Sequence, residues 1–256
     1  MNKIDQLFKE KSQRVLNIYC TAGYPQLNSL QQVLTSLQVH GADIVEIGMP
    51  YSDPLADGPV IQQSNMVAID NGMSIAVLFE QLKTIKEIIQ LPVILMGYMN
   101  PVLQFGIEKF CKMAEETGVS GLILPDLPIY EFETEYRQLF EKHGLRFIFL
   151  ITPETDEERI RQIDDLSSGF LYAVSSSSTT GNNKAIEDQE EYFRKLQAMH
   201  LKNPVLVGFG IKDKPTFLAA SQYTSGAIIG SAYIRVLEKS ADIDLSTKEF
   251  LNGILV

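Results

Sequence analysis

The chain has 256 residues, a formal net charge of −10 and two cysteines. The acidic balance argues against a nucleic acid or an anionic membrane as partner, although it leaves room for a local basic pocket. No apolar run approaches the ~18 residues of a membrane span, and Cys20 and Cys111 lack the spacing of metal ligands or a redox pair. Because charges are spread over residues 1–14, we expect no signal peptide and a cytoplasmic location.

Strand-like and helix-like segments alternate along the chain. A short amphipathic helix is expected near residues 4–8, and Gly41 is expected to end a helix over residues 27–39. The apolar runs predict strands at 15–20, 44–47, 92–96, 121–124, 147–151, 170–174, 205–207 and 227–229. Further helical patterns lie near 61–70, 75–89, 107–117, 130–142, 156–165, 187–199 and 213–222, with a closing helix after Ser231.

Eight strand–helix units in a chain of this length predict an α/β fold, a (β/α)8 TIM barrel. The expected barrel has an extra N-terminal helix and a long loop after its second strand, and residues 1–256 form a single domain. A doubly wound sheet is the alternative fold. It is disfavoured because the segment YCTAGYP after the first strand lacks the spaced glycines of a dinucleotide site. In a barrel, the chemistry belongs at the carboxyl ends of the strands.

The most informative stretch is residues 43–63, DIVEIGMPYSDPLADGPVIQQ. Glu46 stands between apolar residues in a strand that reads as buried on both faces, where a carboxylate is costly unless it has a task. Burial raises a carboxyl pKa, so Glu46 is a candidate general acid. Asp57 lies on a polar, proline-rich loop and is expected to stay ionised, so the two carboxylates can divide acid–base work. Taken singly, Asp53 and Asp57 both read as turn residues.

Histidine and metal chemistry are disfavoured. His40, His143 and His200 each fall at the end of a predicted helix, where an imidazole can meet free carbonyl groups. No Cys/His/Asp cluster has the spacing of metal ligands, so no metal is expected. We therefore expect carboxylates to carry out the acid–base catalysis, assisted by tyrosine.

Two glycine-containing loops predict a phosphate site. Gly208 and Gly210 follow the seventh strand, and Gly230 and Ser231 lie between the eighth strand and a helix. Bare backbone amides at a helix N-terminus bind anions, and barrels often hold phosphate in these two loops. The alternative reading of both loops is a pair of tight turns.

Other residues after the strands predict a lid and an aromatic pocket. The run SSSSTTGNNK, residues 175–184, follows the sixth strand and reads either as a linker or as a mobile lid over the functional face. Aromatic side chains at or beyond strand ends suggest a pocket for a flat apolar group, or ordinary barrel filling. They are Tyr19, Tyr98, Tyr172 and Phe209.

These residues stand in blocks that match a known family. The stretch EIGMPYSDPLADGPVIQ closely resembles the signature of the tryptophan synthase alpha subunit family. The match continues in family order through YMNPVLQFG, LILPDLP, YAVSSSSTTG, GFGI and GSAYI, over nearly the whole chain.

The resemblance implies a lyase of tryptophan biosynthesis that cleaves indole-3-glycerol phosphate to indole and glyceraldehyde 3-phosphate. It implies that Glu46 protonates the indole ring carbon and that Asp57 accepts a hydrogen bond from the indole N–H. By the same resemblance Tyr172 positions the substrate and Thr180 closes the lid onto Asp57. The phosphate would be held by Gly181, Gly210, Gly230 and Ser231.

The resemblance also implies a beta-subunit partner in an alpha2beta2 assembly. That partner carries pyridoxal phosphate and receives indole through a tunnel, so no cofactor is expected in this chain. We expect the segment from Pro101 to Gly106 to be a loop whose apolar residues dock on the partner. Ser178 stands where the family commonly has glycine, which puts the backbone path of the lid in question. Phe105 replaces a frequent tyrosine, which puts a hydroxyl contact with the partner in question.

Two other functions stay open at this point. One is a different barrel enzyme for a phosphorylated substrate, such as an epimerase or isomerase, although paired carboxylates without a metal cluster disfavour an epimerase. The other is a non-catalytic subunit that only activates a partner. The presence of Glu46 and Asp57 disfavours this second reading.

Overall fold

The computed structural model describes residues 1–55, 57–174, 186–208 and 210–256. Within these ranges, nine parallel strand segments form one sheet in the order β5-β4-β3-β2-β1-β9-β8-β7-β6. The strands are β1 (Val15–Thr21), β2 (Ile44–Gly48), β3 (Val93–Met96), β4 (Gly121–Ile123), β5 (Arg146–Phe147), β6 (Leu150–Ile151), β7 (Leu171–Val174), β8 (Val205–Gly208) and β9 (Gly226–Ile229).

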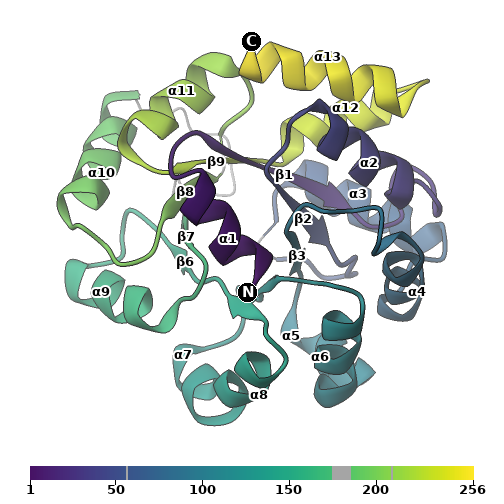
Figure 1. Ribbon diagram of the computed structural model, residues 1–256, viewed down its shortest axis with the longest axis horizontal. Helices are drawn as coiled ribbons and strands as arrows, with labels where there is room; N and C mark the ends of the chain where they lie inside the picture. Colours follow the sequence, from purple (N-terminus) through teal and green to yellow (C-terminus); the bar gives the residue numbers. More distant parts are fainter. Residues whose placement is uncertain (56, 175–185, 209) are drawn as a thin grey trace.

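The two ends of this sheet meet within one short stretch, residues 146–151. The amide of Ile148 donates to the Leu122 carbonyl of β4, whereas the Phe149 carbonyl accepts from the Tyr172 amide of β7, each at 3.0 Å. Because the backbone changes its hydrogen-bond partner from β4 to β7 midway, the predicted strand 147–151 is divided into β5 and β6. The sheet closes, and the predicted (β/α)8 barrel is confirmed, with the strands at the centre of Figure 1 and the helices around them.

The helices occupy the predicted places with three differences. The segment after β3 is helical, the segment 129–142 contains a π-helical turn, η1 (Phe132–Tyr136), and two helices instead of one follow β9. The helices are α1 (Lys3–Glu10), α2 (Leu30–His40), α3 (Pro59–Asp70), α4 (Ile75–Ile85), α5 (Met99–Phe105), α6 (Ile107–Glu116), α7 (Ile129–Glu131), α8 (Arg137–Lys142), α9 (Glu157–Leu166), α10 (Ile186–Ala198), α11 (Lys214–Tyr223), α12 (Ser231–Lys239) and α13 (Ile243–Leu255). No helix in the described ranges is long and apolar enough to cross a membrane.

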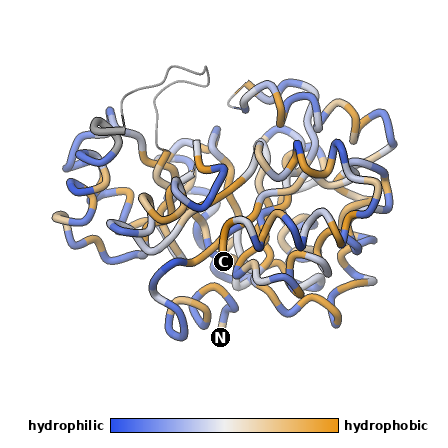
Figure 2. The backbone as a smooth tube through the Cα atoms, turned by 90° about the horizontal axis from the view of Figure 1, so that it is seen from above, coloured by the Kyte–Doolittle hydropathy of each residue, from blue (hydrophilic) through white to orange (hydrophobic). Residues whose placement is uncertain are grey.

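Helix α1 closes one end of the barrel. Its Ile4 is fully buried and packs with the interior residues of the strands. Phe8 meets Phe170 with ring centroids 6.1 Å apart, and Asp5 pairs with Arg146. In Figure 2 this N-terminal segment lies at the lower edge of the molecule, and in Figure 1 it crosses the barrel axis. The opposite end, where the strands finish, is left for the loops that carry the chemistry.

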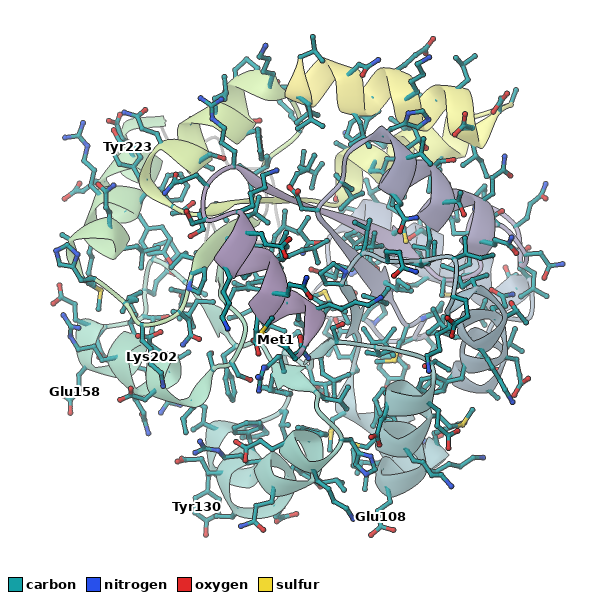
Figure 3. The ribbon with its side chains drawn as sticks, in the orientation of Figure 1. Met1, Glu108, Tyr130, Glu158, Lys202 and Tyr223 are labelled. Carbon is teal, nitrogen blue, oxygen red and sulfur yellow. The ribbon has the colours of Figure 1, made fainter. Side chains whose placement is uncertain are left out.

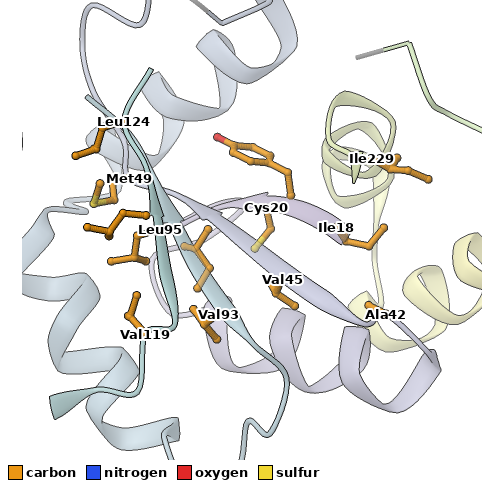
Figure 4. Packing of buried hydrophobic residues seen from close by; sticks show 14 of the residues in the cluster. Ile18, Cys20, Ala42, Val45, Met49, Val93, Leu95, Val119, Leu124 and Ile229 are labelled. Atoms are coloured by element: carbon orange, nitrogen blue, oxygen red, sulfur yellow. The ribbon is translucent and has the colours of Figure 1, made fainter. Parts of the chain in front are cut away.

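Alternate residues of each strand serve two different layers. On β1 and β2, Ile18, Cys20 and Val45 belong to the apolar layer beneath the helices (Figure 4). The interior of the barrel is filled mainly by isoleucine and other apolar residues, among them Ile44, Ile94 and Ile228. Since strand side chains alternate between faces, residues 17, 19 and 21 of β1 point into the barrel beside residues 44, 46 and 48 of β2. The candidate acid is thus placed on the inner face.

Candidate active site

Glu46 lies inside the barrel. It is the middle residue of β2 and pairs in register with Tyr19 of β1 and Ile94 of β3, and only 1% of its surface is exposed. Burial raises the pKa of Glu46 to about 8, an increase that the hydrogen bond from Asn17 opposes and the nearby charge of Asp57 adds to. At neutral pH the carboxyl is therefore largely protonated, as a general acid requires.

Asp57 faces the same space from the loop after β2. Its backbone amide donates to the Pro54 carbonyl at 3.0 Å, and its own carbonyl accepts from the Gln62 side chain at 2.9 Å, just before α3 begins. The Tyr98 hydroxyl donates to Asp57 Oδ2 at 3.4 Å. These contacts hold the loop against α3 and the segment after β3.

Asp57 is buried, although it lies on a polar loop. The side chain is 8% exposed, and this burial raises the pKa of Asp57 to about 6, against the lowering effect of the Tyr98 hydroxyl. The loop is polar in composition, but it folds inward over the strand ends. The carboxyl pKa values still differ in the expected order, so between about pH 6 and pH 8 the ionised Asp57 stands near the protonated Glu46.

Tyr19 and Tyr172 line the interior from within their strands, β1 and β7, and do not stand at the strand ends. Two strand-end glycines make room for their rings. A Cβ on Gly48 would come within 2.0 Å of the Tyr19 hydroxyl, and one on Gly208 within 2.2 Å of the Tyr172 hydroxyl. Both phenols are buried, and burial together with the two carboxylates raises the pKa of each well above its usual range. They remain neutral and present flat rings beside Glu46.

Tyr98 stands at the rim of the site. It is the residue before α5, its ring packs on that of Tyr51 with centroids 5.3 Å apart, and its hydroxyl reaches Asp57. The structure thus brings Tyr98 beside Asp57, and Tyr19 and Tyr172 beside Glu46.

Of the predicted phosphate residues, the structure describes Gly210, Gly230 and Ser231, which follow the ends of β8 and β9. Gly230 is the N-cap of α12 and provides no side-chain cap, so the first amides of this helix keep their capacity to bind an anion. Ser231 is the first residue of α12. Gly230 is also close to the Tyr19 ring, since a Cβ at position 230 would lie 3.7 Å from the ring atom Cδ1 of Tyr19. Gly210 has a φ of +75°, a left-handed conformation that favours glycine.

Several predicted residues fall outside the described ranges. These are Thr180 and Gly181 of the predicted lid, the altered position Ser178, and Phe209. Their roles stay predictions.

The histidines occupy the helix ends that the sequence predicts. His40 is the last residue of α2 and meets Asp244 at 3.0 Å, while His143 caps α8 and meets Glu115 at 2.7 Å. His200 follows α10. Among the described residues, no cluster of three or more His, Cys, Asp or Glu has a geometry that could hold a metal ion.

The predicted loop conformation of Pro101 to Gly106 is wrong, whereas the docking role of this segment stays a prediction. Residues 99–105 form α5, whose first amide, that of Met99, donates to both carboxylate oxygens of Asp126 at 3.0 Å. Val102 is fully buried. Phe105 packs on Phe79 with ring centroids 5.8 Å apart, so it supports this chain's own core. Leu103 alone of the three apolar residues is strongly exposed.

Sequence reasoning missed one residue of the site, Asn17. It stands in the apolar strand VLNIYCT, where a polar side chain carries the same signal that singled out Glu46. Its amide Nδ2 donates to Glu46 Oε2 at 3.0 Å.

Comparison with known proteins agrees with this geometry. The family model described as "Tryptophan synthase alpha chain" matches residues 6–252. The tryptophan synthase alpha chain of Flavobacterium psychrophilum is 51% identical over 96% of this chain and 97% of its own length, and that of Bacteroides thetaiotaomicron is 47% identical over 94% and 95%.

Solved structures give the same result. The tryptophan synthase subunit alpha of Legionella pneumophila superposes with a TM-score of 0.89 at 31% identity, covering 99% of this chain and 97% of that one. A tryptophan synthase structure from M. tuberculosis in an aminoacrylate-bound form gives a TM-score of 0.86 at 29% identity, covering 99% of this chain and 100% of the matched chain. The family model and the relatives span nearly all of the barrel described above, including the strands and loops that carry Glu46 and Asp57. This chain belongs to the tryptophan synthase alpha chain family.

Proposed function

We propose that Glu46 and Asp57 carry out the reaction of this family, the retro-aldol cleavage of indole-3-glycerol phosphate to indole and glyceraldehyde 3-phosphate. The observation that carries the proposal is a pair of buried carboxyls with pKa values of about 8 and about 6, Glu46 inside the barrel and Asp57 on the loop over its strand ends, near enough for the charge of Asp57 to raise the pKa of Glu46. A protonated acid beside an ionised carboxylate is the combination that this reaction needs at neutral pH.

Glu46 acts first as an acid. Its proton passes to the indole ring carbon that carries the glycerol chain, and the ring nitrogen takes up the positive charge. The bond between that carbon and the side chain then breaks, and its electron pair restores the aromatic ring of indole. The hydroxyl on the departing chain becomes the aldehyde, and its proton returns to the Glu46 carboxylate. The proton balance closes on one residue, so no external acid or base is consumed.

Asp57 stabilises the charged intermediate. An ionised carboxylate beside the indole N–H accepts its hydrogen bond, and this bond strengthens as positive charge develops on the ring. Burial of Asp57 supports this role, because an electrostatic interaction is stronger away from water. The Tyr98 hydroxyl holds the carboxylate in place.

The remaining pocket residues bind the two ends of the substrate. Tyr19 and Tyr172 offer flat apolar surface to the indole ring, with Phe209 as a further predicted contact. The uncapped start of α12 at Gly230 and Ser231 receives the phosphate, together with Gly210 and the predicted contact of Gly181. Thr180 is proposed to close the lid onto Asp57.

We further propose a beta-subunit partner in an alpha2beta2 assembly. In this family pyridoxal phosphate belongs to the beta subunit, and the alpha chain needs no cofactor of its own. The exposed apolar residues Leu55, Leu103 and Tyr130 follow β2, β3 and β4, which are neighbours in the sheet, and so they share the strand-end face. Tyr130 projects outward at the periphery in Figure 3. We propose this face as the docking surface. A cytoplasmic location stays a prediction from the sequence.

The test is to incubate the purified chain with indole-3-glycerol phosphate and to measure both products. The parent should release indole and glyceraldehyde 3-phosphate in equal amounts, and Glu46→Gln should be slower by roughly 10²–10⁴-fold, the usual contribution of a general acid. Circular dichroism of the variant confirms that the barrel is intact. Parental rates in a folded Gln variant would refute the assignment of Glu46.

A further inference from the structure

A second polar residue lies deep in the barrel beside Glu46. Asn17 is fully buried and pairs in register with Ile44 of β2 and Ile228 of β9. Both partners belong to the apolar interior cluster that fills the barrel. An amide in such a layer costs free energy unless it makes hydrogen bonds, and an isoleucine or leucine would fill the space at no such cost.

The side chain of Asn17 is directed to the acid. Because Asn17 stands opposite Ile44, Glu46 is its diagonal neighbour two residues further along β2 on the same inner face. Its Nδ2 donates to Glu46 Oε2 at 3.0 Å, while Asn17 Oδ1 has no hydrogen-bond partner within the described ranges. The Asn17 amide therefore uses its Nδ2 group to bind the Glu46 carboxyl, while its Oδ1 atom makes no hydrogen bond within the described ranges.

An amide can serve both forms of a carboxyl group. When Nδ2 faces the carboxyl group, the amide donates a hydrogen bond to the carboxylate. When the amide rotates by about 180° around the Cβ–Cγ bond, Oδ1 takes the place of Nδ2 and accepts a hydrogen bond from the O–H of the protonated acid. Glu46 must pass through both forms in the proposed reaction, which gives up its proton and takes one back.

We propose that Asn17 is a positioning residue for Glu46, one that holds the carboxyl at the barrel centre in both protonation states. It acts through Glu46 and does not touch the substrate. The inference rests on the proposed function, because it has meaning only if Glu46 is the acid. Among the described residues, the ionisable groups that interact with Glu46 are Asp57, Tyr19, Tyr172 and Cys20, which the test leaves unchanged.

The experiment compares Asn17→Leu, which keeps the approximate shape and removes the amide, with the parent. Loss of a donor to the ionised form should raise the pKa of Glu46 in the free enzyme, so the basic limb of kcat/KM against pH should move upward by about one unit, the size expected for a hydrogen bond to a charged group. In addition, kcat should fall about tenfold or more because the acid is no longer held in line, while KM should change less than about twofold.

Asn203→Leu is the matched control. Asn203 also donates an amide to a largely buried carboxylate, Asp164 Oδ1, at 2.9 Å, but it stands before β8 at the opposite end of the barrel. This variant should keep the acidic and basic limbs of the parental activity profile against pH, even where it is less stable. If Asn17→Leu does not fold, Asn17→Val takes its place, because valine suits a strand and also removes the amide; it should shift the basic limb upward and lower kcat in the same way.

The outcomes separate the two claims. If folded Asn17→Leu keeps the parental kcat and the parental basic limb of the pH profile while Glu46→Gln is inactive, the positioning role is overturned and the proposed function stands. Full activity of Glu46→Gln would overturn the proposed function itself.

Discussion

At the scale of single residues, the two carboxyl groups are set apart by their surroundings. Glu46 meets one amide in an apolar barrel, and desolvation dominates its pKa. Asp57 is also buried, but the Tyr98 hydroxyl partly compensates for the lost water. Two carboxyl groups can thus take different roles, one as a protonated acid and the other as an anion, because their surroundings differ.

Burial of Glu46 has a consequence for stability that can be measured without any substrate. Its pKa rises from 4.5, the ordinary value, to about 8 in the folded chain, so between these values the folded state binds more protons than the unfolded state. The contribution of Glu46 to the free energy of unfolding is therefore fully present below about pH 4.5 and is lost as the pH rises through about 8. Glu46→Gln cannot ionise, so its stability relative to the parent should increase over this range.

Urea titrations at several pH values measure that difference. Glu108→Gln, at an exposed glutamate of α6, is the control, since its side chain is in water in both states. A difference between parent and Glu46→Gln that stays constant from pH 5 to pH 8 would mean that Glu46 ionises near its ordinary pKa.

At the scale of elements, the start of α12 is the part of the phosphate site that can be tested in the described structure. A Cβ at Gly230 would meet Tyr19 and Ile61 only at ordinary contact distances of 3.5 and 3.7 Å, so a small side chain fits there. Gly230→Asp places a negative charge where the anion binds, and like charges about 4 Å apart repel strongly enough to weaken binding by about tenfold or more.

Glycerol phosphate titrated against the folded variants measures this loss. Gly230→Asn has the same shape without the charge, and it should retain most of the affinity. Equal affinities of the Asp and Asn variants would show that the loop after β9 is only a turn.

The elements also show what the sequence could and could not predict. Eight apolar runs and their intervening helical patterns predicted the barrel, and the conflict between Glu46 and its apolar neighbours predicted the acid. The start of α5 could not be read locally, because its cap is Asp126, which comes from another loop. The burial of Asp57 was missed for a similar reason, since folding of the loop over the strand ends is a tertiary effect. Asn17 carried a readable signal in its strand and was overlooked.

At the scale of the whole molecule, the two ends of the barrel are specialised. Helix α1 fills the end where the strands begin. The strand-end face carries Asp57 above the buried Glu46, together with the exposed side chains of Leu55, Leu103 and Tyr130. Docking of the beta subunit on this face would place the partner beside the site where indole is released. A tunnel between the two subunits, which the family resemblance implies, would need this placement.

Leu103→Asp tests the docking face, because it puts a charge on an exposed apolar position of α5 without disturbing the core contacts of Phe105. The variant should lose co-elution with the beta subunit on size exclusion. Val39→Asp is the control, since Val39 is 68% exposed at the end of α2, which lies at the opposite end of the barrel. Normal co-elution of folded Leu103→Asp would place the partner elsewhere.

The rate of indole-3-glycerol phosphate cleavage by the isolated chain, measured as kcat from pH 5 to pH 10, tests the central claim most directly. The same titration gives kcat/KM, which reports the groups of the free enzyme. Glu46 must be protonated and Asp57 ionised, so kcat/KM should rise through about pH 6 and fall through about pH 8. A kcat/KM that stays level or continues to rise well above pH 8 would contradict the assignment of Glu46 as the acid.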